Sequence, residues 1–150
     1  MESLLETGAR FPRMTAAICF GAAAAATTHF AWIPDARMSG RAPLLTLGAG
    51  LAHAASGVLM GPRLVDRTRT RTAGDARVLG AVTSLIACAL FALAFALWVE
   101  SSNAVPHGPL SFLAYAPMIA FFSFLAAGWA LVLVSIGVAW GLFRLLPRGG

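Results

Sequence analysis

Four long apolar stretches without a charged residue in their interiors most constrain how this chain can fold. They cover, approximately, residues 14–33, 43–61, 78–98 and 118–143. A helix of about 20 apolar residues crosses the ~30 Å hydrocarbon core of a bilayer. Because lipid offers the backbone no hydrogen-bonding partner, each stretch is predicted to be a helix. The sequence therefore predicts an all-α, polytopic integral membrane protein, a single domain over residues 1–150 with four transmembrane helices in an up-down bundle.

The composition agrees with a lipid environment. Hydrophobic residues make up 59% of the chain and charged residues 11%, and the mean hydropathy is +0.78. Soluble domains are less apolar and carry about 25% charged residues. The first stretch is predicted to be a retained helix, because it is longer than the apolar region of a secretory signal and no A-x-A cleavage site follows it.

The last stretch leaves two alternatives at Pro117. Either residues 110–116 form a short interfacial helix before the final span, which span length favours, or the final helix begins earlier and kinks at the proline. Trp129 falls in the middle of this span, and packing in the core is its expected role.

All eleven basic residues are arginines, and their distribution predicts the orientation. They lie before the first span (Arg10, Arg13), between the first and second (Arg37, Arg41), between the second and third (Arg63, Arg67, Arg69, Arg71, Arg77) and after the fourth (Arg144, Arg148). With both termini cytoplasmic, nine arginines face inward and two outward. The positive-inside rule therefore predicts a multi-pass protein of the bacterial cytoplasmic (inner) membrane with both termini inside.

The arginines of residues 62–77 form a cluster that is predicted to bind anionic lipid headgroups, at roughly 1 kcal/mol per basic residue, or to dock an acidic partner. Nucleic acid is not expected, because the aromatic residues used for base stacking are missing from this segment.

Small residues recur at four-residue intervals on three of the predicted helices. The third carries Gly80, Ser84, Cys88, Ala92 and Ala96, the second carries the pairs Gly57 and Gly61 and Gly50 and Ala54, and the fourth carries Gly137 and Gly141. Such stripes let helix backbones approach closely, which drives helix association in lipid. The sequence predicts close packing within the bundle or against another protein. Cys19 and Cys88 fall at different depths, so a disulfide between them is not expected.

Two histidines lie inside the predicted spans, where polar groups are costly. His53 is flanked by Ala49, Gly50 and Gly57, a bare helix face of the kind that a flat macrocycle held by an imidazole needs. His29 has Ala25 in the corresponding position. The alternative is a neutral imidazole that hydrogen-bonds Thr27, Ser56 or a backbone carbonyl between helices.

The segments AATTHFAWI (25–33) and AGLAHAASG (49–57) resemble the A-x-x-x-H-x-x-x-L motif of light-harvesting antenna polypeptides. The resemblance implies that His29 and His53 ligate the magnesium of bacteriochlorophyll, with Ala25 and Ala49 making room for the ring. Ile33 and Gly57 stand where the motif has leucine, and antenna polypeptides have one span. Haem is the other cofactor considered, and the different predicted depths of the two histidines favour separate ligands over a shared iron.

No motif of a nucleophile with its base, paired carboxylates, metalloprotease or phosphate loop occurs, so an enzyme is not expected. The predicted function is that of a non-catalytic accessory or scaffolding subunit, bound to other membrane-protein subunits of a larger complex such as a photosynthetic or electron-transfer assembly. The alternative is a small homo-oligomeric membrane transporter or channel.

Overall fold

The computed structural model describes residues 11–32, 42–66, 70–101 and 112–146, and within them the chain forms helices and no strand. The helices are α2 (Pro12–Trp32), α3 (Ala42–Val65), α4 (Ala73–Ser101), α5 (Phe112–Ser123), the π-helical turn η1 (Phe124–Gly128) and α6 (Trp129–Leu145). The all-helical prediction is confirmed for the described residues.

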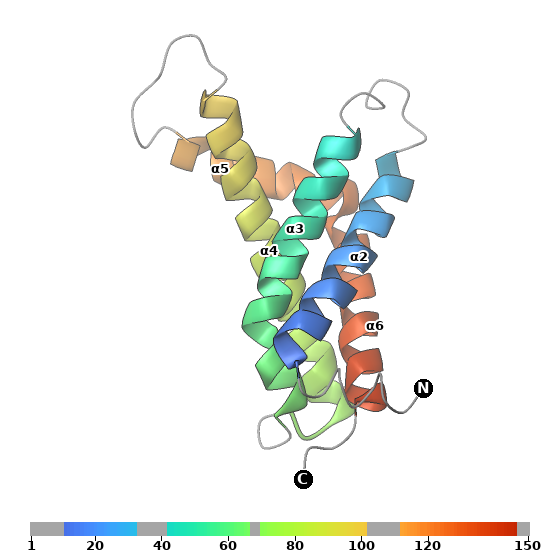
Figure 1. Cartoon of the computed structure of the whole chain (residues 1–150). Helices are drawn as coiled ribbons and strands as arrows, with labels where there is room; N and C mark the ends of the chain where they lie inside the picture. The colour runs from blue at the N-terminus through green and yellow to red at the C-terminus, as the bar shows by residue number, and fades with distance from the viewer. Residues whose placement is uncertain (1–10, 33–41, 67–69, 102–111, 147–150) are drawn as a thin grey trace.

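Four of these helices run alternately up and down the molecule (Figure 1). α2 packs mainly against α3, and α4 packs against α6 and α3, while α2 and α6 also touch and so close the bundle. α5 lies across one end of α4 instead of along the bundle (Figure 1). The starts of α2 and α4 and the ends of α3 and α6 therefore lie at the same end, the lower one in Figure 1.

The helix ends at this lower end follow from local chemistry. α2 begins at Pro12, a position where the missing N–H of proline would have no helical partner. α3 ends where the Thr70 hydroxyl donates a hydrogen bond of 2.6 Å to the Arg63 carbonyl. α4 begins with a capping box, in which the Asp75 N–H donates to Thr72 Oγ1 (3.1 Å) and the Thr72 N–H donates to Asp75 Oδ2 (2.8 Å).

The interior of the bundle consists mostly of small and weakly polar side chains, with Phe20 and Leu64 among its few large ones, whereas many large apolar side chains point outward. Ser56, Thr83, Ser84 and several alanines are fully buried. The outward-facing set includes Phe30, Leu51, Leu59, Val78, Phe121 and Leu133. Water-soluble domains bury their large apolar residues, whereas helices in lipid associate through small ones. This distribution is the one expected for a bundle surrounded by lipid.

Two helical segments, Pro43–Leu64 and Ala73–Ser101, are long and apolar enough to cross a membrane. In the most apolar stretch of 18 residues within Ala73–Ser101, 28% of the residues are buried. This share is low for the core helix of a soluble protein. α6 is apolar but has 17 residues. Membrane association is supported by these helices, and the predicted bundle of four spans is not confirmed.

The predicted span 118–143 is not a single α-helix. The helix begins at Phe112 and continues through Pro117, so it begins earlier, as the second alternative had it. The change of direction lies at η1 instead of at the proline (Figure 1). A π-turn fits one extra residue into the helix and so breaks its regular course. Gly128 suits this turn, because a Cβ added there would lie 2.7 Å from the Phe124 ring. Trp129, just after the turn, is 58% exposed and does not pack in the core as expected.

Candidate functional site

His53 lies in the middle of α3 and is the main polar group that the fold encloses there. Its side chain is 2% exposed. Nδ1 lies 3.0 Å from the Ala49 carbonyl oxygen, one turn earlier in the same helix. Because a carbonyl oxygen only accepts, Nδ1 carries the proton and donates. Because an apolar interior disfavours the charged imidazolium, the ring is the neutral tautomer whose remaining lone pair is on Nε2.

That lone pair faces α4. Nε2 lies 3.3 Å from Ser84 Oγ, so the Ser84 hydroxyl donates to it across the helix interface. Ser84 is itself fully buried. An imidazole ligates a metal through a free nitrogen lone pair. At His53 both ring nitrogens are engaged inside the bundle, and ligation at Nε2 requires Ser84 to withdraw.

The small residues around His53 are covered by α2. Ala49 is buried, and a Cβ added at Gly50 would lie 3.2 Å from Ala25 Cβ and 3.3 Å from the Gly21 carbonyl oxygen. A Cβ added at Gly57 would lie 2.8 Å from the Ala16 carbonyl oxygen. The bare face that suggested room for a macrocycle is thus occupied by the backbone of a neighbouring helix.

His29 is exposed on α2, where its ring meets the edge of Phe30 at a centroid distance of 6.0 Å. The approach of Gly50 to Gly21 and Ala25 sets the antiparallel register of α2 and α3. In that register His53 is level with residues near 20 of α2, about 13 Å along the helix from His29. The structure does not bring the two histidines together.

The other predicted packing residues divide into enclosed and open positions. A Cβ added at Gly61 would lie 2.6 Å from the Pro12 carbonyl oxygen, and one added at Gly80 would meet the α6 backbone at Ser135 and Ile136. Ala92 and Ala96 are buried, and Cys88 is half-buried and free, as is Cys19. Gly137 and Gly141 differ, because a Cβ added at either would meet nothing within 4 Å.

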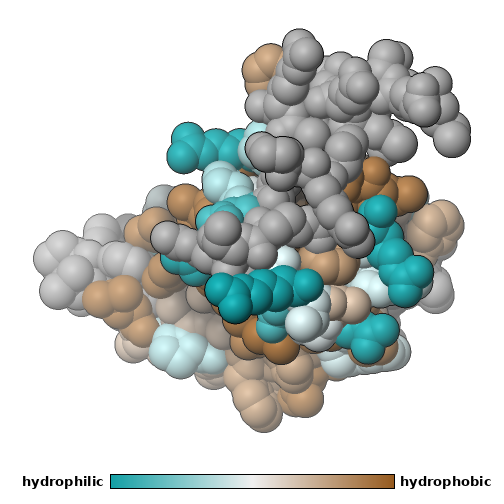
Figure 2. Space-filling view, turned by 90° about the horizontal axis from the view of Figure 1, so that it is seen from below, coloured by the Kyte–Doolittle hydropathy of each residue, from teal (hydrophilic) through white to brown (hydrophobic). Residues whose placement is uncertain are grey.

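The arginines gather at the lower end of the bundle, which we call the basic end and define by Arg13, Arg63, Arg71, Arg77 and Arg144. All five are exposed. Figure 2 shows this end with hydrophilic and hydrophobic side chains next to one another. Arg144 lies over the Trp140 ring, 4.9 Å from its centroid. The predicted Arg67 and Arg69 lie outside the described residues.

Asp75 is the acid held in place at this end, just before the apolar part of α4 that begins at Val78. The hydrogen bonds from the Thr72 backbone and hydroxyl lower the pKa of its carboxyl below the ordinary value, with a further contribution from Arg71. Asp75 is thus ionised at neutral pH, next to the start of a helix where a negative charge is favourable.

Other enclosed polar residues differ from the prediction: Ser56 was expected to hydrogen-bond the imidazole itself, and Thr83, Thr28 and Thr46 were not singled out. Ser56 donates its hydroxyl to the His53 carbonyl at 2.9 Å, and Thr83 donates to the Leu79 carbonyl at 2.7 Å. Thr28 and Thr46 have buried hydroxyl oxygens with no hydrogen-bond partner among the described residues. The four-residue spacing of Thr83 from Leu79 allows such a bond, but nothing in the spacing shows which face of α4 is enclosed.

Within the described residues, no three His, Cys, Asp or Glu side chains are grouped so that they could hold a metal ion. No protein family, curated protein or solved structure matches this chain significantly.

Proposed function

We propose that this chain is a non-catalytic accessory or scaffolding subunit of a larger membrane complex and that it docks there through one face of α6. This open face of α6 consists of Trp129, Leu133, Gly137, Trp140 and Gly141, which follow one another at helical spacing. Four of the five are exposed and Gly141 is half-buried. The two glycines leave a stretch of bare helix backbone, which we call the notch, with Trp140 beside it and Trp129 about two turns earlier.

The observation that supports the proposal is the contrast between the glycines of this face and the other helical glycines. A glycine in a helix costs about 1 kcal/mol relative to alanine. At Gly57, Gly61 and Gly80 this cost is offset by close contact with the backbone of another helix. At Gly137 and Gly141 the described part of the chain supplies no such contact. A helix from another subunit, packed into the notch, would supply it.

The finer features of the proposal follow from the arginines. With the basic end on the cytoplasmic side, the positive-inside rule is satisfied and both termini lie inside. The location that we propose for the chain is accordingly the bacterial inner membrane, as a multi-pass protein. α2 and α6 then cross the membrane together with α3 and α4, because the four helices run side by side.

The proposal includes no pigment or haem. The antenna-like spacing around His53 has another use in this fold, since Gly50 and Gly57 receive α2 and the imidazole links α3 to α4. The absorption spectrum of the purified chain and of a His53→Ala variant tests this point. We expect no band that depends on His53.

Photo-crosslinking in native membranes tests the docking face. Benzoylphenylalanine is placed at Leu133, on the open face of α6, and in a second variant at Leu51, which is exposed on α3. We expect a protein adduct from position 133 and none from position 51. Gly137→Leu should abolish the adduct and release the chain from a larger complex on native gels, because the added side chain fills the notch.

A matched control is Ala94→Leu, which places the same leucine side chain at an exposed position of α4. It should leave both the adduct and the migration unchanged. An adduct between two copies of this chain, with flux through liposomes, would instead support a homo-oligomeric transporter. A chain that migrates alone and crosslinks to no protein would overturn the proposal.

A further inference from the structure

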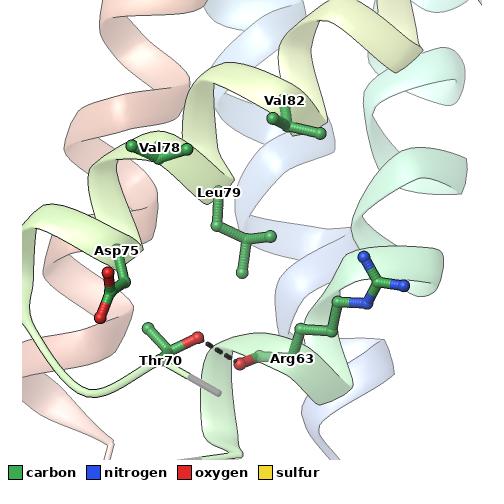
Figure 3. A pocket seen from close by; sticks show the side chains of 6 residues that line it. All are labelled: Arg63, Thr70, Asp75, Val78, Leu79 and Val82. Carbon is green, nitrogen blue, oxygen red and sulfur yellow. Dashed lines mark hydrogen bonds between the residues drawn. The ribbon is translucent and has the colours of Figure 1, made fainter.

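An open hollow of about 480 Å³ lies at the basic end, between the end of α3 and the start of α4 (Figure 3). Its lining combines a polar set with an apolar one: Arg63, Thr70, Asp75, Val78, Leu79 and Val82. Figure 3 shows Arg63 and Asp75 on opposite sides, with Leu79 between them. The volume is within the ~300–1,000 Å³ of small-molecule sites.

The polar part of the lining is fixed by hydrogen bonds. Thr70 is buried, and its hydroxyl donates to the Arg63 carbonyl at 2.6 Å. Asp75 Oδ2 accepts from the N–H groups of Arg71 (3.0 Å) and Thr72 (2.8 Å). These bonds hold Thr70 against the end of α3 and engage the Asp75 carboxylate with the backbone just before α4. The Asp75 carboxylate is therefore turned toward the backbone of Arg71 and Thr72.

The charge around the hollow favours an anion. The exposed arginines Arg63, Arg71 and Arg77 outnumber Asp66 and Asp75 in the described residues between 63 and 77. Arg13 and Arg144 add positive charge at the same end. Arg63 is the arginine that lines the hollow itself.

The apolar part of the lining continues along α4. Val78 is 65% exposed, and Val82 and Leu85 follow it on the same helix face at i+4 and i+7. From Val78 to Leu85 this exposed ridge is about 10 Å long, and it runs from the hollow toward the middle of the bundle. A molecule that fits both parts has a charged head and an apolar chain.

We propose that the hollow binds a single anionic phospholipid, with the phosphate at Arg63 and an acyl chain along Val78, Val82 and Leu85. A hydrated free phosphate gains nothing from the valine and leucine walls, whereas a lipid buries apolar surface there. The inference requires that the basic end faces a membrane surface. It does not require the proposed docking face of α6.

Native mass spectrometry of the isolated full chain in detergent tests the lipid site. The chain is offered equal amounts of phosphatidylglycerol and phosphatidylcholine with the same acyl chains. We expect one phosphatidylglycerol molecule to be retained in preference to phosphatidylcholine. Arg63→Gln should reduce that preference about fivefold, as expected for the loss of about 1 kcal/mol from one basic residue at a lipid surface.

Arg13→Gln is the matched control, because it removes one exposed charge at the same end without changing the hollow. The preference of this variant for phosphatidylglycerol should stay within about twofold of that of the unmodified chain. A twofold change corresponds to less than half of the free energy expected from one arginine in contact with the lipid. Excess inorganic phosphate should not displace the lipid, and displacement would mean a free-anion site instead. Equal retention of the two lipids by the unmodified chain, or equal losses in both arginine variants, would overturn the inference. Because the chain is isolated, this result is independent of the partner tested at α6.

Discussion

His53 shows how a polar residue can be accommodated in an apolar helix without a ligand. Its Nδ1–H is satisfied one turn back on its own helix, and its Nε2 receives the Ser84 hydroxyl from α4. A buried acceptor that loses its donor is destabilised by about 1–3 kcal/mol in water-soluble proteins, and interhelical bonds in membranes average about 0.6 kcal/mol. Ser84 is thus the residue on which the enclosed imidazole depends.

We expect Ser84→Ala to lower the free energy of unfolding in detergent by about 1 kcal/mol, because Nε2 loses its donor inside the bundle. Thermal unfolding monitored by circular dichroism measures the change. Ser101→Ala is the control, since the exposed Ser101 hydroxyl bonds the Trp98 carbonyl of its own helix. Equal losses in the two variants would contradict a specific role for the His53–Ser84 bond.

At the scale of helices, the same residue type has two different roles in this chain. Gly57 lies where α2 leaves no space for a Cβ, and Gly137 lies where none of the described residues comes within 4 Å of an added Cβ. The physical consequences of adding one methyl group therefore differ in sign. At the first position the helices must separate, and at the second the helix only gains intrinsic stability.

We expect Gly57→Ala to destabilise the isolated chain by about 1–3 kcal/mol, because its Cβ would overlap the Ala16 carbonyl. Gly137→Ala should stabilise the isolated chain by about 1 kcal/mol through helix propensity. Unfolding in a series of denaturing detergent mixtures measures both. A destabilised Gly137→Ala chain would show that the open face already packs against something within one copy.

At the scale of the whole molecule, the arrangement of α4 makes the orientation testable. α4 has 29 residues and is therefore about 43 Å long. Arg71 precedes it at the basic end and Ser101 is its last residue. If the basic end is cytoplasmic, these two positions lie on opposite sides of the membrane.

In a chain with Cys19 and Cys88 replaced by alanine, an impermeant maleimide should label Ser101→Cys in intact cells. Arg71→Cys should be labelled only after the membrane is opened, because the positive-inside rule places it in the cytoplasm. Leu85→Cys, midway along α4, is the control and should resist labelling in both conditions. Labelling of Arg71→Cys in intact cells would reverse the orientation.

The sequence was sufficient to predict the positions of three helices, but it was insufficient to predict the course of the last part of the bundle. Of the predicted spans, residues 14–32, 43–61 and 78–98 fall within α2, α3 and α4, and Ile33 lies outside the described residues. The helices extend a few residues further, because polar caps such as Thr72 end them. η1 was not foreseen, since a π-turn leaves apolar composition unchanged. The bond from His53 to Ser84 was also missed, because the partner of a side chain across two helices depends on how each helix is rotated.

The small side chains of the interior also determine which mutations the fold can tolerate. Most enclosed positions hold alanine, serine, threonine or glycine, so few substitutions there can leave an empty space. In a water-soluble protein the damaging core changes are mainly truncations of large residues. In this chain the harmful inherited or engineered variants should be enlargements, and shortening the outward leucines and phenylalanines should alter the fit to lipid more than the fold.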